Sequence, residues 1–225
     1  KKGVSVTICH VLRFTPFFTT LKRLIDEGKI GLDDGIGKFL DFTGNFGDCR
    51  IFHLLTHSSG MLPGIPLFDL PSPENALSAI LTSSKASKAG KKVSYSCLGY
   101  ITLGKILELV GGESLDVLAK KYVFAPLEMS SACYNPDKNL PVAATEKYAA
   151  SGEFATGRVH DENARFLGGV SGNAGVFASL DDVISLAGML SARGRTKNGT
   201  QYLSEELFDL AIRNHTPFSE DARGL

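Results

Sequence analysis

Two histidines, His53 and His57, stand four residues apart just before the sequence Ser58-Ser59-Gly60. In an α-helix this spacing places both imidazoles on one face, where they could hold a zinc ion. However, Ser58-Ser59-Gly60 predicts the end of that helix, and no third ligand is close in sequence. We therefore predict no metal site here.

A second group with acid–base chemistry is His160-Asp161-Glu162, which lies shortly before several glycines between Gly168 and Gly175. Imidazole and carboxylate groups can exchange protons with a substrate, but the same residues also suit a solvated, hydrogen-bonded loop. Both interpretations stay open. A phosphate cradle would need a following Gly-Lys-Ser/Thr sequence or a βαβ setting, and neither is present. The glycines therefore predict tight turns and no cofactor site.

Composition excludes several classes of protein. The 225 residues include 24 basic and 24 acidic side chains, so the formal net charge is zero. Without a basic field or a basic stripe, we expect no nucleic-acid partner. The cysteines are widely spaced and predict free thiols in or near a core; they are Cys9, Cys49, Cys97 and Cys133.

Membrane and export signals are weak. No apolar run approaches the roughly 18 residues that a membrane span requires. The apolar stretch 4–18 is interrupted by His10 and Arg13, and no small-residue cleavage site follows it. The lack of a convincing signal peptide favours a cytoplasmic location over export.

The elements that position these side chains are mainly helical. Apolar periodicity and capping residues predict helices from about 16 to Gly28, over 51–55, from 73 to 81, over 98–110, 114–122 and 183–190, and over 203–212. Ser72 is the expected cap of the third helix, and Ser179 with Asp182 that of the sixth. Residues 130–178 show no clear period and predict a long functional loop. Residues 93–95 are the one short extended piece that we expect.

Three blocks of sequence resemble the class C β-lactamases, the D-alanyl-D-alanine peptidase-like proteins and the family VIII esterases. They are residues 21–34, residues 51–60 with Leu-Leu-Thr-His-Ser-Ser-Gly, and residues 95–104 followed by Phe-Ala-Pro-Leu-Glu-Met at 124–129. A later stretch, 160–177, resembles one bacterial branch of this group. The likeness covers about residues 16–225 and implies acyl transfer through an active-site serine, without a cofactor.

The resemblance assigns roles to two residues of the second family motif, Tyr-x-Asn, which stands here as Tyr95-Ser96-Cys97. Tyr95 then holds the position of the general base. A tyrosine at the start of a buried helix is otherwise often a core residue with a bonded hydroxyl group. Cys97 replaces the asparagine and lacks the two-sided hydrogen bonding of an amide.

The first family motif, Ser-x-x-Lys, is not present. Alignment on the family pattern puts Arg13 at the nucleophile position and Pro16 at the lysine position. No lysine in the chain has a serine three residues before it. Threonine stands there before Lys22 and Lys85, and we interpret both pairs as chance spacings on helix surfaces.

The third family motif, Lys or His followed by Thr/Ser and Gly, is also missing; Ala155-Thr156-Gly157 is the nearest sequence and has no cation. We divide the chain into an unmatched segment, 1–16, and a partial β-lactamase-like domain, 17–225. A frameshift, a truncation or an artificial boundary would each produce this pattern, as would the loss of catalysis in a binding descendant.

The expected fold is the α+β serine β-lactamase/transpeptidase-like fold, represented mostly by its helical part, with most of the antiparallel sheet missing. The expected function is that of a β-lactamase-related serine hydrolase acting on a β-lactam, peptide or ester, inactive as this chain stands. The alternative is a non-catalytic binding module on the same scaffold. Missing strands would expose an apolar face, through which we expect the chain to pair with another copy or fragment.

Overall fold

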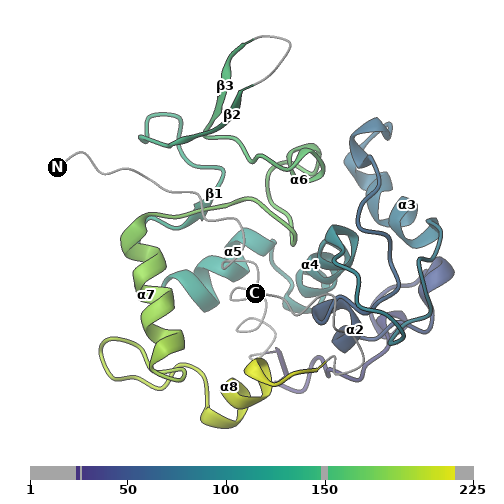
Figure 1. The fold of residues 1–225 in the computed structure, drawn as a ribbon, viewed down its shortest axis with the longest axis horizontal. Coiled ribbons are helices and arrows are strands. Elements are labelled where there is room, and N and C mark those ends of the chain that lie inside the picture. Colours follow the sequence, from purple (N-terminus) through teal and green to yellow (C-terminus); the bar gives the residue numbers. More distant parts are fainter. Residues whose placement is uncertain (1–23, 26, 148–151, 216–225) are drawn as a thin grey trace. The chain divides into compact units, whose positions relative to one another are not determined.

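A computed structural model describes residues 24–25, 27–147 and 152–215 (Figure 1). The chain divides into two compact units, which we treat separately. The α4 unit comprises residues 21–115, 171–173 and 214–225, and the α7 unit comprises residues 1–20, 116–170 and 174–213. The predicted helix that begins near Pro16 lies outside the described residues except at its end.

The α4 unit is built from short helices around one longer helix. Its elements, in chain order, are the 3₁₀ turns η2 (Ile36–Lys38) and η3 (Gly44–Phe46), helix α2 (Ile51–Leu55), the 3₁₀ turns η4 (Leu67–Asp69) and η5 (Pro73–Asn75), helix α3 (Ala76–Thr82) and helix α4 (Cys97–Gly111). An isolated bridge pairs Gly35 with Arg50.

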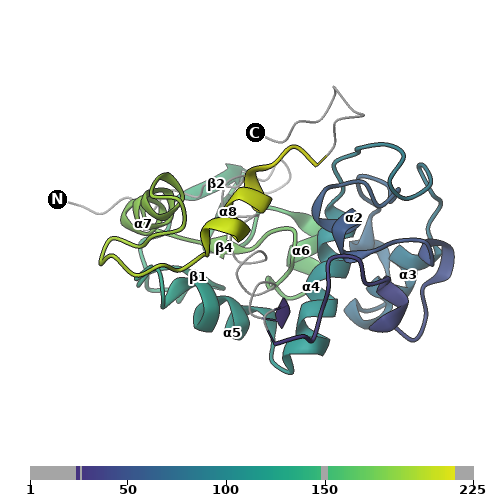
Figure 2. The same ribbon diagram turned by 90° about the horizontal axis from the view of Figure 1, so that it is seen from below.

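Helix α4 is the centre of this unit, and both α2 and α3 pack against it (Figures 1 and 2). Seven consecutive residues, 98–104, are buried, followed by Ile106 and Leu107. Apolar periodicity of this kind predicts a helix with one buried face, but the first two turns of α4 are buried all round because neighbouring segments cover them. Each large apolar side chain buried in this way stabilises the fold by about 1.5–3 kcal/mol.

The end of the first helix follows the sequence prediction. Gly28 has a left-handed backbone with φ +67°. Its N–H donates to the carbonyl oxygen of Ile25 at 2.8 Å, and the N–H of Lys29 donates to that of Leu24 at 2.8 Å. This pair of bonds defines a Schellman motif, which glycine accommodates without strain.

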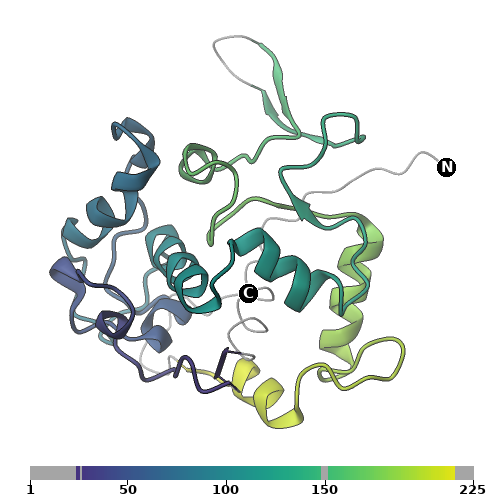
Figure 3. The same cartoon turned by 180° about the vertical axis from the view of Figure 1, so that it is seen from behind.

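The α7 unit combines helices with small antiparallel sheets. Its elements are α5 (Leu115–Ala119), the π-helical turn η6 (Lys120–Phe124), β1 (Cys133–Tyr134), β2 (Ala144–Lys147), β3 (Phe154–Thr156), α6 (Glu162–Phe166), β4 (Val176–Phe177), α7 (Leu180–Ser191) and α8 (Glu205–Ile212). Strand β1 pairs with β4, with Cys133 opposite Phe177. Strand β2 pairs with β3, with Ala144 opposite Thr156. The β2–β3 pair is the green hairpin in Figure 3.

Helix α7 begins with the predicted capping arrangement. The Ser179 hydroxyl accepts from the Asp182 N–H, while the Asp182 carboxylate accepts from the Ser179 N–H at 2.9 Å. The inward face of α7 then joins a core whose buried large side chains are Val123, Phe124, Leu127, Met129, Leu186, Met189 and Leu203. No helix in the described ranges combines the length and apolar character needed to cross a bilayer.

Two expectations about local structure are wrong, and a third concerns residues 93–95. Residues 130–178 are not one long loop, because two strand pairs and α6 lie within them. Residues 93–95, predicted to be a short extended piece, belong to no sheet, and the Ser94 N–H donates to the carbonyl oxygen of His57 at 2.8 Å. The Ser72 hydroxyl caps no backbone N–H and donates to the Asn75 side chain at 3.0 Å.

Candidate functional site

Ser96 fixes the start of helix α4 and the middle of the Tyr95–Cys97 segment. It has an extended backbone, and its hydroxyl accepts from the Gly99 N–H at 3.2 Å, as an N-cap should. The same hydroxyl donates to the carbonyl oxygen of Leu62 at 2.6 Å. With only 1% of Ser96 exposed, this one buried side chain ties the helix start to a distant loop.

Segments 57–63 and 86–97 lie side by side through backbone hydrogen bonds. The N–H groups of Ala86 and Gly90 donate to the carbonyl oxygens of Gly60 and Ser58, each at 2.8 Å. The Cys97 N–H donates to that of Pro63 at 2.9 Å. The Leu-Thr-His-Ser-Ser-Gly block therefore supports the segment that carries Tyr95.

Gly60 is required at one point of this pairing. Its φ is +77°, and a Cβ there would stand 2.1 Å from the carbonyl oxygen of Ser87. No L side chain fits that approach without moving the backbone.

The side chains of Tyr95 and Cys97 contact each other at the start of helix α4. Tyr95 is 42% exposed, and Cys97 is partly buried. The Cys97 thiol donates to the Tyr95 hydroxyl oxygen across 3.8 Å. A phenol that is accessible yet held at a helix start can exchange a proton with a bound molecule, which a fully buried core tyrosine cannot do.

His57 is a neighbour of Tyr95 that we considered from the sequence only as a possible zinc ligand. The two ring centroids are 4.7 Å apart. The His57 Nδ1 atom accepts from the Ser96 N–H at 3.1 Å. The sequence feature that could have pointed to His57 is the short block Thr-His-Ser-Ser-Gly. However, the block does not specify which backbone group the His57 imidazole contacts.

The zinc interpretation of His53 and His57 finds no support in the geometry. Helix α2 ends at Leu55, and His57 has a left-handed backbone with φ +52°, so the two imidazoles do not share a helix face. The His53 Nδ1 atom accepts from the Arg50 N–H at 3.1 Å. Within the described ranges, no three His, Cys, Asp or Glu residues group as metal ligands.

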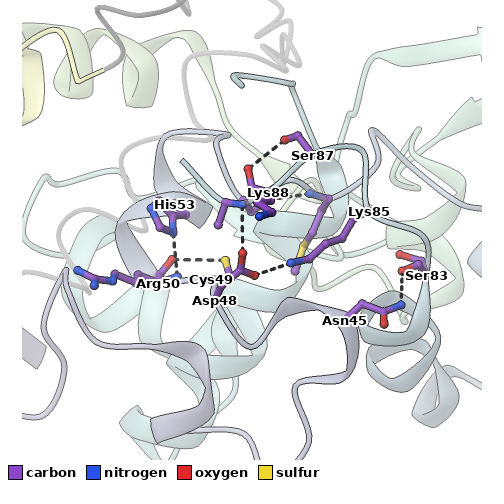
Figure 4. A network of polar contacts seen from close by, with 12 residues as sticks. Asn45, Asp48, Cys49, Arg50, His53, Ser83, Lys85, Ser87 and Lys88 are labelled. Carbon is purple, nitrogen blue, oxygen red and sulfur yellow. Dashed lines mark hydrogen bonds and ion pairs between the residues drawn. The ribbon is translucent and has the colours of Figure 1, made fainter. Parts of the chain in front are cut away.

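Arg13 and Pro16, the predicted nucleophile and lysine positions, lie outside the described residues, as does the Thr19–Lys22 pair. The pair Thr82–Lys85 is described and does not form a dyad. The Lys85 ammonium group binds the Asp48 carboxylate at 2.6 Å (Figure 4). The Thr82 hydroxyl donates to the carbonyl oxygen of Ser78 at 2.9 Å.

A third threonine–lysine pair, Thr102–Lys105 in helix α4, has the same spacing. Thr102 is fully buried, and its hydroxyl donates to the carbonyl oxygen of Leu98 at 2.9 Å. Lys105 instead forms an exposed ion pair with Glu108 at 2.8 Å. Helical spacing alone therefore does not make a reactive pair.

The cysteine thiols differ in their surroundings. The three described cysteines carry thiols and are not joined in disulfides, as predicted; Cys9 lies outside the described residues. Burial, with a contribution from the Asp48 charge, raises the pKa of the Cys49 thiol to about 12. Burial also raises the pKa of the Cys133 thiol. Neither group is a ready nucleophile at neutral pH, because the thiolate is the reactive form.

His160-Asp161-Glu162 has structural contacts. Asp161 caps helix α6 by accepting from the Ala164 N–H at 2.8 Å. His160 Nδ1 lies 3.7 Å from the Glu146 carboxylate, which also faces Arg165 at 3.9 Å. The cap explains Asp161 without any catalytic role.

Of the glycines between 168 and 175, Gly168 and Gly169 lie in a turn, as predicted, whereas Gly172 lies in a bend and Gly175 in neither. Gly169 and Gly175 have φ +84° and +120°. A Cβ on Gly169 would stand 2.0 Å from the Asn135 side-chain oxygen, and one on Gly175 would stand 2.3 Å from the carbonyl oxygen of Gly169. These positions exclude larger residues on steric grounds.

Comparison with known proteins places the chain in a family. A family model described as "Beta-lactamase" matches residues 17–224. An N-acetylmuramyl-L-alanine amidase of Bacillus subtilis is 28% identical over 211 residues, which cover 79% of this chain and 48% of that protein.

Solved structures share the fold. An octameric penicillin-binding protein homologue from Pyrococcus abyssi has a TM-score of 0.69 at 24% identity, covering 92% of this chain and 47% of that chain. A β-lactamase/D-alanine carboxypeptidase from Yersinia pestis has a TM-score of 0.66 at 16% identity, covering 92% and 57%.

The chain belongs to the β-lactamase family of penicillin-recognising serine hydrolases. The α+β, mostly helical, partial β-lactamase-like fold predicted from the sequence is confirmed. The chain spans about half the length of the curated relatives that it matches.

Proposed function

We propose that Tyr95 occupies the general-base position of an acyl-transfer site and that Cys97 stands in the third position of the same motif. In such a site a base takes the proton of a serine hydroxyl as that hydroxyl attacks a carbonyl carbon. The observation that supports this proposal is the placement of Tyr95: the residue is 42% exposed and directly precedes Ser96, the N-cap of the buried helix α4. The Cys97 thiol reaches its hydroxyl oxygen across 3.8 Å.

We also propose that this 225-residue chain does not form an acyl-enzyme by itself. Arg13 and Pro16 stand at the nucleophile and lysine positions of the family pattern. The guanidinium of Arg13 stays protonated and cannot attack, and Pro16 has no amine side chain. The described threonine–lysine pairs are occupied by other partners.

The substrate class that we propose is the acyl class of the family: a β-lactam, a peptide or an ester. Two relatives are named for an amidase and for a D-alanine carboxypeptidase, which supports a peptide amide first. We would test binding by titrating a D-alanyl-D-alanine peptide, a penicillin and a short ester into the ¹⁵N-labelled chain. Saturable shifts in the amide signal of residue 95 that are weakened in Tyr95→Phe would support the site.

Acylation is tested directly by intact-mass analysis after incubation with a fluorescent penicillin and with a fluorophosphonate. We expect no adduct, whereas a family hydrolase with an intact Ser-x-x-Lys motif labels in parallel. A covalent adduct on any side chain of this chain would overturn the second proposal.

The second candidate is a non-catalytic binding module, and the thiol at Cys97 favours it, since a thiol does not replace both hydrogen bonds of an amide. The DNA upstream of Phe17, read in all frames, separates the two. A frame that encodes Ser-x-x-Lys at the matching spacing favours the hydrolase. A stable monomer that binds peptide without that frame favours the module.

We propose, finally, that copies of the chain associate through an apolar strip on helix α7. Leu180 and Ile184 lie one turn apart with 53% and 58% exposure. The Pyrococcus abyssi homologue is octameric, which supports self-association on this scaffold. Light scattering should give a mass above 24.1 kDa that falls to the monomer in Leu180→Ser/Ile184→Ser; a monomeric parent chain would refute this proposal.

A further inference from the structure

His57 contacts three consecutive residues of the Tyr95 segment. Its carbonyl oxygen accepts from the Ser94 N–H at 2.8 Å, and its Nδ1 atom accepts from the Ser96 N–H at 3.1 Å. Between these bonds, its ring lies against the Tyr95 ring, with centroids 4.7 Å apart and planes tilted by 39°. The backbone on both sides of Tyr95 and the ring of Tyr95 are therefore held by one residue.

The His57 imidazole also packs against a second tyrosine ring. The ring of Tyr100, one turn into helix α4, has its centroid 4.8 Å from that of His57 at an angle of 32°. Tyr100 is 3% exposed, and its hydroxyl donates to the carbonyl oxygen of Leu55 at 3.0 Å. His57 therefore links a buried, anchored tyrosine to the accessible Tyr95.

This arrangement depends on an uncommon backbone conformation. His57 has φ +52°, in the left-handed region that is costly for residues with a Cβ. Such strain persists only where surrounding contacts fix it, and it is concentrated at functional sites. Because Nδ1 accepts a hydrogen bond, the neutral ring carries its proton on Nε2.

We propose that His57 is a positioning residue that sets the orientation of the Tyr95 phenol and the backbone of the second motif. This inference rests on the proposed function of Tyr95. His57 itself need not touch substrate, because it acts through the Ser96 N–H and the ring of Tyr95.

His53 provides a matched comparison within the same segment. Its Nδ1 atom also accepts a backbone N–H at 3.1 Å, from Arg50. Its ring instead lies 6.0 Å from that of Phe52, centroid to centroid. Changing His53 to asparagine therefore removes an imidazole and alters a similar bond outside the Tyr95–Cys97 segment, which matches the change made in His57→Asn.

The test uses the full chain labelled with ¹⁵N and with ¹³C in the tyrosine rings, and Tyr95→Phe assigns the Tyr95 signal. His57→Gly accepts the left-handed backbone but removes the ring and the Nδ1 acceptor. His57→Asn also tolerates that backbone, and its amide oxygen can replace Nδ1. His53→Asn is the control.

We expect the Ser96 amide to exchange with solvent about fivefold faster in His57→Gly, which corresponds to the loss of one ordinary hydrogen bond. His57→Asn should restore Ser96 protection to within about twofold by the same reasoning. The Tyr95 ring signals should shift in both His57 variants, because both lose the stacked imidazole. His53→Asn should leave the Ser96 exchange rate and the Tyr95 signals unchanged.

Unchanged Ser96 exchange and unchanged Tyr95 signals in a folded His57→Gly would overturn the proposal. Equal effects in His53→Asn would also overturn it, because they would indicate general loosening. If His57→Gly does not fold, His57→Asn still decides through the Tyr95 signals alone. The exchange and ring measurements use no substrate, so failure of the positioning role is distinguishable from failure of the proposed function, which the mass analysis and peptide titration report.

Discussion

Ser96→Ala tests whether the start of helix α4 and the loop at Leu62 are stabilised by one hydroxyl group. The substitution removes the cap on the Gly99 N–H, at 3.2 Å, and the donor to the Leu62 carbonyl oxygen, at 2.6 Å. Loss of an N-cap costs about 1 kcal/mol. Loss of the second bond costs about 1 kcal/mol more. We expect the free energy of unfolding to fall by about 2 kcal/mol.

The control for this prediction is Ser204→Ala. The Ser204 hydroxyl caps helix α8 by accepting from the Leu207 N–H at 3.3 Å and should contribute the cap energy alone, about 1 kcal/mol. Urea unfolding gives both changes, and thermal unfolding of Ser96→Ala should show a Tm lower by roughly 4–8 °C. Equal losses in the two variants would show that the bond to Leu62 contributes nothing, and the reasoning would be wrong.

Three further predictions concern residues of the α4 unit. Gly60→Ala should lower the free energy of unfolding, measured in urea, by roughly 3 kcal/mol. The reason is that the added Cβ would stand 2.1 Å from the Ser87 carbonyl oxygen on a left-handed backbone. A loss below about 1 kcal/mol would contradict this close approach. Cys49, fully buried and with a pKa raised to about 12, should react with iodoacetamide at pH 8 only as fast as the chain opens, so mild urea should accelerate its labelling. Hydrogen bonding to Lys85 lowers the pKa of Asp48, so this carboxylate stabilises the fold above its unfolded pKa and loses that effect as the pH falls through the lower folded value. Asp48→Asn should therefore lower the free energy of unfolding by less than about 1 kcal/mol at pH 6, and by still less in high salt or near pH 2. A larger loss at pH 2 than at pH 6 would show that the assigned sign is wrong.

Short-range patterns were reliable guides where the contacts that stabilise an element lie within that element. Gly28 ends its helix in the left-handed conformation, and Ser179 with Asp182 caps helix α7. Helix α4 was predicted over 98–110 and extends over Cys97–Gly111. Ser72 failed because its hydroxyl had a competing partner in the Asn75 side chain.

The candidate site was predicted only in part. The family pattern assigned Tyr95 and Cys97, and the structure brings the Cys97 thiol to the Tyr95 hydroxyl oxygen. The family pattern did not reveal that the His57 imidazole accepts from the Ser96 N–H, because these residues are 39 positions apart. Thr102 and Lys105 illustrate the reverse case, in which the spacing suits a dyad but burial of one side chain and exposure of the other separate them.

The amino-acid sequence by itself determined the family and the helical character, since these depend on residue types and short spacings. Its assignment of Tyr95 and Cys97 to the second motif stays a prediction. Only the tertiary structure decided which residue holds Tyr95, which lysines are paired, and that two small strand pairs lie within 130–178. The physical reason is range: caps and turns depend on neighbours along the chain, whereas the hydrogen bonds at Leu62 and His57, the burial of Cys49 and the pairing of Lys85 depend on segments that meet only after folding.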